Sequence, residues 1–229
     1  MNNLADLFIW YPVFVFSTTC HEAAHAWAAY RGGDLTAHAD GHVSLDPLPH
    51  IRRSPFGMVV IPIVSFLLGG WMIGWASVPL NPEWARRYPR RSALMALAGP
   101  GANLTLALLA FGIIRVLIEF GVLQATGSLW PPDLVMLPNA QEHGTALGFV
   151  VRALSLTLGL NVILGLFNLI PLPPLDGAAA VEGAAPRTAG SFYARMREVP
   201  MFELLGLLVA WRVFPYVANP ALYLVAGLL

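Results

Sequence analysis

A short stretch near the amino terminus, His21-Glu22-Ala23-Ala24-His25, contains three side chains whose types and spacing suit metal chemistry. Each helical residue advances by about 100°, so His21 and His25 lie on one face, one turn apart. Two imidazoles placed in this way can share a zinc ion, with ring nitrogens about 2.0–2.1 Å from the metal. Glu22 projects about 60° from His25 and can reach a metal-bound water as a general base. The stretch therefore predicts a zinc site with a base beside it.

A chance pattern of exposed polar residues is the alternative interpretation, because three matching positions in five recur by accident in soluble helices. Here, however, the flanking residues 7–16 and 26–30 are mostly apolar. An ionisable side chain beside hydrocarbon is functional by default, because placing it there costs free energy. The surroundings of the motif therefore favour the metal site.

A catalytic zinc needs three protein ligands and an open position, and Asp176 is our candidate for the third ligand. It lies in NLIPLPPLDG, residues 168–177, where three prolines cannot continue a helix. The alternative role for Asp176 is the N-cap of a new helix. The predicted path of the chain through a membrane, described below, favours the ligand role.

The composition predicts an integral membrane protein. Of the 229 residues, 57% are hydrophobic and 11% are charged, and the mean hydropathy is +0.64, whereas about 25% of the residues of a soluble domain are charged. The formal net charge is zero and no basic tract occurs, so nucleic acid is not an expected partner. The single cysteine excludes an internal disulfide framework. No repeat or linker divides the chain, so we expect one domain over residues 1–229.

Apolar runs of about 20 residues predict helices that cross a lipid bilayer. We expect an all-α bundle of about five to six membrane segments. The last region is either one span or two shorter segments, because FPYVANP interrupts it. A short helix is expected to begin at Asp176. The predicted boundaries are roughly 4–30, 56–78, 92–124, 145–170 and 201–229.

The arginines predict the orientation, because loops rich in basic residues stay in the cytoplasm. Arginines occur in stretches 31–55, 79–91 and 183–200, whereas stretch 125–144 contains none. That stretch, which includes Glu142 and His143, is therefore expected to be a solvent-facing loop outside the cytoplasm.

This orientation places the candidate ligands on one side of the membrane. The first segment runs inward and carries His21 and His25 toward its inner half, and the segment at 145–170 also runs inward and ends just before Asp176. We therefore expect a multi-pass protein of the cell membrane whose active site lies toward the cytoplasm.

The segment at 56–78 conflicts with this orientation if it crosses the bilayer completely. The arginines at 52–53 and those at 86–91 would then lie on opposite sides. Pro62 and the pair Gly69-Gly70 interrupt its helical pattern. Such breaks are tolerated at membrane depth where protein covers them. We therefore predict a re-entrant hairpin or a broken pair of short helices.

Three motifs together resemble the site-2 protease family, whose members are intramembrane zinc metalloproteases that perform regulated intramembrane proteolysis. The motifs are HEAAH on an early membrane helix, AGPGAN at the start of a later one, and NLIPLPPLDG after another. HADGHVSLDPLPHIRRSPFG and GWASVPLNP resemble the compact prokaryotic branch, which has no appended regulatory domain. The similarity covers about residues 15–180.

The resemblance implies a zinc metalloendopeptidase in which His21, His25 and Asp176 bind one Zn²⁺ per chain. Glu22 would be the catalytic base that takes a proton from a zinc-bound water and delivers it to the leaving nitrogen. The implied substrates are membrane proteins, cleaved in or near a transmembrane helix. The oligomeric state is not defined by the sequence.

The resemblance also implies residues that bind substrate. Asn168 would contact the substrate backbone, and Asn103, in GPGAN, would lie on a helix face that approaches the site and take part in substrate binding. A substrate helix must be unwound locally, and an extended segment beside the site can hold it by strand addition. HVSLDPL (42–48) and ASVPLNP (76–82) are candidates, because β-prone residues there stand beside prolines that suit edge positions.

Two other functions are compatible with the same histidines: a metal transporter with a transit site, and a scaffold that binds membrane helices without cleaving them. Glu22 argues against both, because neither needs a base between two ligands. His38, His42 and His50 form a second group in the polar loop after the first segment. A second metal site or a gate is one interpretation, but solvated loop histidines are more common and are what we expect.

Overall fold

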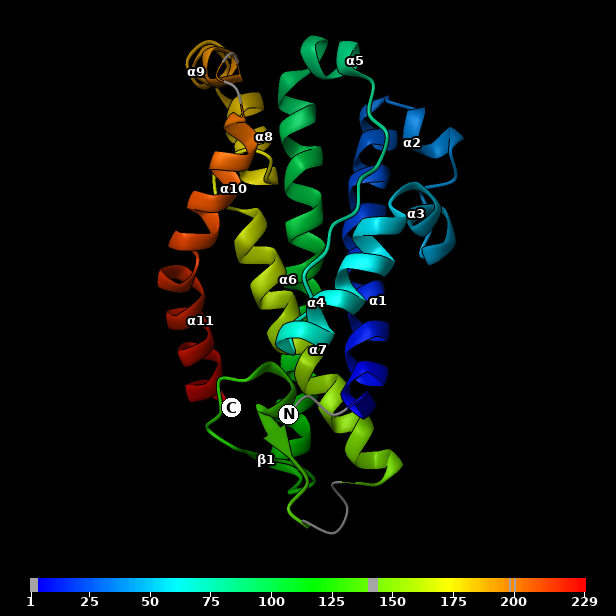
Figure 1. Cartoon of the computed structure of the whole chain (residues 1–229), viewed down its shortest axis with the longest axis vertical. Helices are drawn as coiled ribbons and strands as arrows, with labels where there is room; N and C mark the ends of the chain where they lie inside the picture. Colours follow the sequence, from blue (N-terminus) through cyan, green and yellow to red (C-terminus); the bar gives the residue numbers. More distant parts are fainter. Residues whose placement is uncertain (1–3, 140–143, 198, 200) are drawn as a thin grey trace.

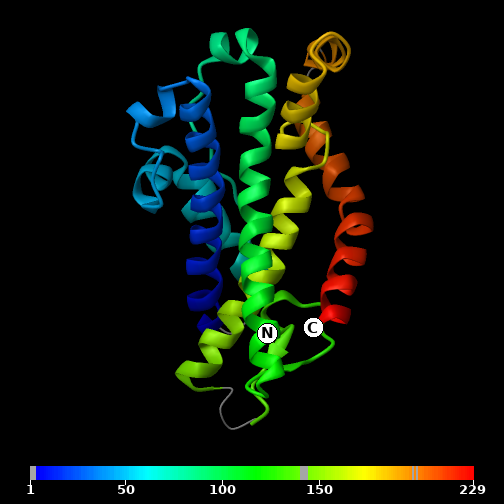
Figure 2. The ribbon, with the colours of Figure 1, turned by 180° about the vertical axis from the view of Figure 1, so that it is seen from behind.

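The protein is a bundle of long helices, seen here in a computed structural model that describes residues 4–139, 144–197, 199 and 201–229 (Figure 1). The three longest helices are α1 (Leu4–Gly32), α6 (Pro89–Glu119) and α7 (Ala146–Asn168). They pack against one another, and α6 contacts both of the others along much of its length (Figures 1 and 2). The predicted all-α membrane protein is therefore confirmed.

Shorter elements surround these three helices. Several begin at a side-chain cap: Asp46 accepts a hydrogen bond from the Leu48 amide at 3.0 Å, and Asn81 accepts one from the Glu83 amide at 2.9 Å, each just before a proline in the first turn. The elements are α2 (Thr36–Ala39), α3 (Pro47–Arg53), the π-helix η1 (Phe56–Val60), α4 (Ile61–Gly69), α5 (Pro82–Arg87), β1 (Gln124–Ala125), the 3₁₀-helix η2 (Pro131–Asp133), β2 (Val135–Met136), α8 (Asp176–Ala184), α9 (Ala189–Arg197), α10 (Phe202–Val213) and α11 (Pro215–Leu228).

Two described helices, α6 and α7, are long and apolar enough to cross a membrane by themselves. Two bent pairs raise this number to four if each pair is one span: α3 with η1–α4, bent by 112°, and α10 with α11, bent by 41°. The prediction of about five to six segments included α1, which spans 29 residues. α1 is long enough but does not reach the same apolarity, because it carries the polar residues of the candidate site.

The path of the chain between α3 and α5 supports the re-entrant prediction. After the bend, α4 ends at Gly70, whose φ of 72° is a left-handed conformation that glycine adopts without strain. Residues 71–81 then run in extended form back to α5, in the half of the bundle where α2 and α3 also lie (Figure 1). The arginines at 52–53 and those at 86–91 therefore lie in the same half of the bundle.

The predicted β-like stretches beside the site are corrected in part. The described strands are β1 and β2, which pair antiparallel and lie at the end of the bundle opposite α5 (Figure 1). Residues 43–45 bend and Pro47 begins α3, so a strand over residues 42–48 was a wrong prediction. Residues 76–81 are extended and have no partner strand among the described residues. Glu142 and His143 lie outside the described residues.

Labelling of single cysteines tests the re-entrant path. In a Cys20→Ser background, Arg53→Cys and Glu83→Cys should react with a membrane-impermeant maleimide from the same side, because the chain turns back between them. Gln124→Cys, at the β1 end, should react from the opposite side. If positions 53 and 83 were labelled from opposite sides, the hairpin would be replaced by a complete span.

Candidate metal centre

Three ligand atoms from two helices converge on one point. His21 Nε2 and His25 Nε2 lie 3.0 Å apart, and Asp176 Oδ2 lies 3.1 Å from the first and 3.3 Å from the second. Ligands about 2.0–2.1 Å from a tetrahedral zinc are separated by about 3.3–3.4 Å. The three atoms therefore stand close to three corners of such a tetrahedron, and the structure brings together all three predicted ligands.

The hydrogen bonds on the far side of each imidazole decide what the Nε2 atoms can do. His25 Nδ1 lies 2.7 Å from the Met95 carbonyl oxygen, which only accepts, so this nitrogen donates. His21 Nδ1 lies 2.6 Å from Asn103 Oδ1 and also donates. In neutral imidazoles both Nε2 atoms then carry lone pairs, as metal-bound histidines require. The 3.0 Å separation is thus a contact between two acceptors.

Asp176 adds a third acceptor to this point. Its Oδ2 is buried and has no hydrogen-bond donor among the described residues. Three lone pairs that face one another repel, and each buried polar atom without a partner costs about 1–3 kcal/mol. A cation between the three atoms would remove both costs. The donor set, two imidazole nitrogens and one carboxylate oxygen, is the type that binds zinc. The residues therefore fit a zinc ion.

A chain of buried amides fixes the orientation of His21. Asn161 Nδ2 donates to the Thr157 carbonyl at 2.8 Å and to Ser17 Oγ at 2.9 Å, so Asn161 Oδ1 is the atom that accepts from Asn103 Nδ2 at 2.8 Å. This bond turns Asn103 Oδ1 toward His21. The donor and acceptor in each of these hydrogen bonds thus follow from the Thr157 carbonyl, which can only accept. The series of hydrogen bonds links α7, α6 and α1.

Asn103 holds His21 in this structure, and its predicted part in substrate binding stays a prediction. Its side chain is 0% exposed and its amide is engaged with His21, Ser17 and Asn161. Its amide therefore orients His21, one of the three candidate ligands. Asn161 was missed by the sequence analysis, although a lone amide within the apolar run LTLGLNVILGL is the kind of residue that marks a buried polar contact.

α6 approaches the two histidines at Gly99. A Cβ added there would lie 2.6 Å from both His21 Nε2 and His25 Cε1, closer than real Cβ atoms come to other atoms. Gly99 is buried within the helix and its backbone forms a wall of the space around the three ligand atoms. Any larger residue would fill the position that the metal needs.

The first turn of α8 is held in place by the preceding loop. A Cβ on Gly177 would lie 2.5 Å from the Leu169 carbonyl carbon and 2.6 Å from the Ile170 oxygen, so the loop packs directly on this turn. Asp176 is the first residue of α8 and the N-cap position is Leu175, which makes no capping side-chain bond. The N-cap alternative for Asp176 is therefore wrong.

The remaining predicted site residues are Glu22 and Asn168. Glu22 follows His21 on α1 and is 6% exposed. Asn168 is the last residue of α7, and its Nδ2 donates to the Leu164 carbonyl at 3.0 Å. It does not take part in the hydrogen bonds around His21 that the structure describes. Its contact with substrate stays a prediction.

The second group of histidines differs from the expectation. His42 and His50 are buried, 4% and 0% exposed, because α2 and α3 fold the loop back onto α1. Their rings meet edge to face, with centroids 5.1 Å apart, while His38 stacks on Tyr30. Burial, helped by the neighbouring His50 and Arg53, lowers the pKa of His42. Solvation of His42 and His50 was a wrong prediction, and the described residues around them form no three-ligand metal group.

Comparison with known proteins identifies the class of the site. The model of the family described as "Peptidase family M50" matches residues 11–210. The chain belongs to peptidase family M50. This confirms the predicted resemblance to the site-2 protease family, and with it the enzyme class of a zinc metalloendopeptidase. No solved structure gives a significant match.

Bacterial relatives carry names of the same class. The chain is 31% identical over 191 residues to "Putative zinc metalloprotease YwhC" of Bacillus subtilis (strain 168), covering 79% of this chain and 75% of that protein. It is 31% identical over 169 residues to "Putative zinc metalloprotease Rip2" of Mycolicibacterium smegmatis, covering 74% of this chain and 54% of the relative. For the Rip2 of Mycobacterium tuberculosis (strain H37Rv) the values are 30% over 196 residues, with 86% and 63% covered. The chain thus spans about half to three quarters of these relatives.

Glycine substitutions on α6 test the metal site. Gly99→Ala should greatly reduce the zinc content of the purified membrane protein, measured by atomic emission, because the new methyl group displaces both imidazoles. Gly101→Ala is the matched control, since a Cβ there meets nothing within 4 Å. Both changes favour the helix intrinsically. Equal zinc contents in the two variants would contradict the placement of α6 against the ligands.

Proposed function

We propose that this M50 enzyme is an intramembrane protease that hydrolyses peptide bonds in or near transmembrane segments of membrane proteins. One zinc per chain would be held by His21, His25 and Asp176. The observation that carries the proposal is the buried cluster of three acceptor atoms beside the buried Glu22. This cluster lies among helices that are apolar enough for a membrane, where few water-soluble peptides would reach it.

Glu22 supplies the proton transfers of the reaction. When bound, zinc polarises the scissile carbonyl and lowers the pKa of its water. The Glu22 carboxylate would take a proton as the water oxygen forms a bond to the carbonyl carbon. It would then deliver that proton to the amide nitrogen as the carbon–nitrogen bond breaks. Asn103 keeps His21 in the required tautomer throughout.

The extended segment 71–81 is suited to hold an unwound substrate. Gly74 packs against Phe14, and the Asn81 amide donates to Asp34 Oδ2 at 2.9 Å. Phe14 precedes the two histidines on α1 and Asp34 follows them, just after α1 ends, so the segment between these contacts runs alongside the part of the chain that carries the histidines. Figure 1 shows this segment running from α4 to α5 beside α1. Its backbone has no partner strand among the described residues, so a peptide can pair with it as an added strand.

The depth of the site supports an active centre toward the cytoplasm of the cell membrane. His25 lies seven residues before Gly32, the end of α1, which corresponds to about 10 Å along the helix. Arg31, α5 and the start of α6 belong to the same end of the bundle, and together they contain five arginines (31, 86, 87, 90 and 91). Basic residues of this kind mark the cytoplasmic side.

Replacement of the base tests the proposed reaction. Glu22→Gln should retain zinc and lose cleavage of a single-span substrate in liposomes by about 10²–10⁴-fold, because the amide cannot accept the proton. Glu119→Gln is the control, since it removes an exposed carboxylate paired with Arg115 on the last turn of α6. A metal transit site or a non-cleaving scaffold would be indicated if Glu22→Gln and the wild type behaved alike.

Prolines in the extended segment test strand addition. Successive backbone amides of a strand point to opposite edges, so Ala76→Pro and Ser77→Pro remove donors on different edges. We expect one of them to reduce cleavage of a helical substrate at least tenfold, with zinc retained, and the other to have a smaller effect. If both variants keep zinc and cleave at the wild-type rate, substrate does not pair with this segment.

A further inference from the structure

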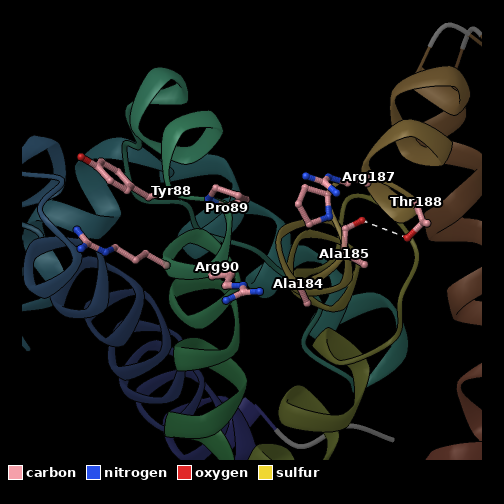
Figure 3. Close-up of a pocket in the computed structure, with 9 residues that line it drawn as sticks. Tyr88, Pro89, Arg90, Ala184, Ala185, Arg187 and Thr188 are labelled. Carbon is pink, nitrogen blue, oxygen red and sulfur yellow. Dashed lines mark hydrogen bonds between the residues drawn. The ribbon is translucent and has the colours of Figure 1, made fainter.

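An arginine-lined hollow lies between the start of α6 and the turn that joins α8 to α9. It has a volume of about 650 Å³ and is lined by residues 88–91 and 184–188. Figure 3 shows Arg90 on the α6 side of it and Arg187, with Ala184 and Ala185, on the side of the turn after α8. The hollow is thus polar at its flanks, and neither α6 nor α8 closes it.

The guanidinium groups of the two flanking arginines have no partner within the part of the chain that the structure describes. Arg90 and Arg187 are exposed, and neither forms an ion pair with a described residue. Arg91, the third arginine of the lining, is occupied elsewhere: its Nη1 donates to the Gly32 carbonyl at 3.0 Å and its guanidinium lies 4.6 Å from the centre of the Tyr88 ring. Two positive charges therefore face the hollow without a described counterion.

At the opposite end of the bundle, arginines are paired with carboxylates of the protein. Arg115 pairs with Glu119, and Arg152 pairs with both Asp6 and Asp133. The contrast indicates that positive charge is neutralised within the protein at one end, whereas at the other end it is available to an external anion.

The hollow lies at the depth of lipid headgroups if the protein is placed in a membrane as its family and helices indicate. α6 has 31 residues and is about 46 Å long, while the hydrocarbon core is about 30 Å thick and the bilayer with its headgroups about 40–45 Å. The first turn of α6, which carries Arg90, therefore lies in the headgroup region. Basic pockets between helices on this side bind anionic headgroups.

We propose that the hollow between Arg90 and Arg187 binds a phosphate group, supplied by the headgroup of an anionic phospholipid. Arginine suits this ligand because its planar guanidinium donates paired hydrogen bonds to phosphate oxygens. One phosphate held by both residues would connect the start of α6 to the end of α8. These segments already touch, since a Cβ on Gly183 would lie 2.9 Å from Ala93 Cβ.

The two helices that the phosphate would connect, α6 and α8, also carry residues of the candidate metal centre. α8 begins with the proposed zinc ligand Asp176 and ends at Ala184, in the lining of the hollow, and α6 carries Gly99 and Asn103. A bound phosphate would therefore stabilise the packing of α8 on α6, on which the distance between Asp176 and the two histidines depends. Anionic lipid is expected to strengthen zinc retention as well as to raise thermal stability.

The test compares nanodiscs of phosphatidylcholine with nanodiscs that also contain phosphatidylglycerol. For the wild type, phosphatidylglycerol should raise the unfolding midpoint by about 2–4 °C and remain bound in native mass spectrometry. The double variant Arg90→Gln/Arg187→Gln should lose both effects while matching the wild type in phosphatidylcholine. Arg86→Gln/Arg195→Gln, with the same change of charge at exposed positions outside the hollow, should keep them.

The outcomes separate the site from its alternatives. Equal losses in both double variants, or none in either, would show diffuse attraction and overturn the site. If millimolar inorganic phosphate in phosphatidylcholine nanodiscs stabilises the wild type but not Arg90→Gln/Arg187→Gln, and phosphatidylglycerol adds nothing, free phosphate is the ligand and the lipid assignment fails. These readouts need no proteolysis, so they stand apart from the outcome of the Glu22 experiment.

Discussion

The convergence of three lone pairs on one buried point is the constraint on which the rest of this structure depends. Two imidazole nitrogens and a carboxylate oxygen within 3.0–3.3 Å of one another are tolerated where a cation is shared among them. Each imidazole must then be held in the tautomer that leaves Nε2 bare. The Met95 carbonyl and the chain of amides from Thr157 through Asn161 to Asn103 provide this, and all of them lie on α6 or α7.

α6 is the helix that makes this arrangement possible. It contacts α1, α7 and α8 more extensively than those helices contact one another. Small residues allow the close approach, as they do generally between membrane helices, where apolar side chains gain little by leaving lipid. Gly99 admits the two imidazoles, and Gly183 of α8 sits against Ala93. The metal centre therefore depends on the close approach of the helix backbones as much as on the types of the ligand side chains.

The cost of polar groups in an apolar protein also explains the shape of α1. Thr18, Thr19, His21, Glu22 and His25 are all buried in the protein, and α1 has no continuous stretch as apolar as those of α6 and α7. A polar face of this kind is stable in a membrane only if neighbouring helices cover it. α6 and α7 cover it by packing, since both contact α1.

Several features followed from local patterns. Apolar runs located α6, α7 and the broken segment at 56–78, because helices in lipid must be long and continuous unless proline or glycine interrupts them. The HExxH spacing located two ligands, because a helix places residues four apart on one face. The distribution of arginines, together with the breaks at Pro62 and Gly69-Gly70, was enough to predict that the chain turns back before α5.

Tertiary packing decided what local patterns left open. Asp176 had two roles consistent with its neighbours. In the structure the N-cap position is Leu175, and packing brings Asp176 Oδ2 to 3.1 Å from His21 Nε2, about 150 residues earlier in the chain. The hydrogen bond between Asn103 and His21 and the burial of His42 and His50 were not predicted, for the same reason: each depends on what another helix brings to it. Sequence by itself determined which side chains could bind a metal, because helical periodicity is local. Only the close packing of α1, α6 and α8 decided which of them meet, because contacts between distant residues depend on how whole helices approach.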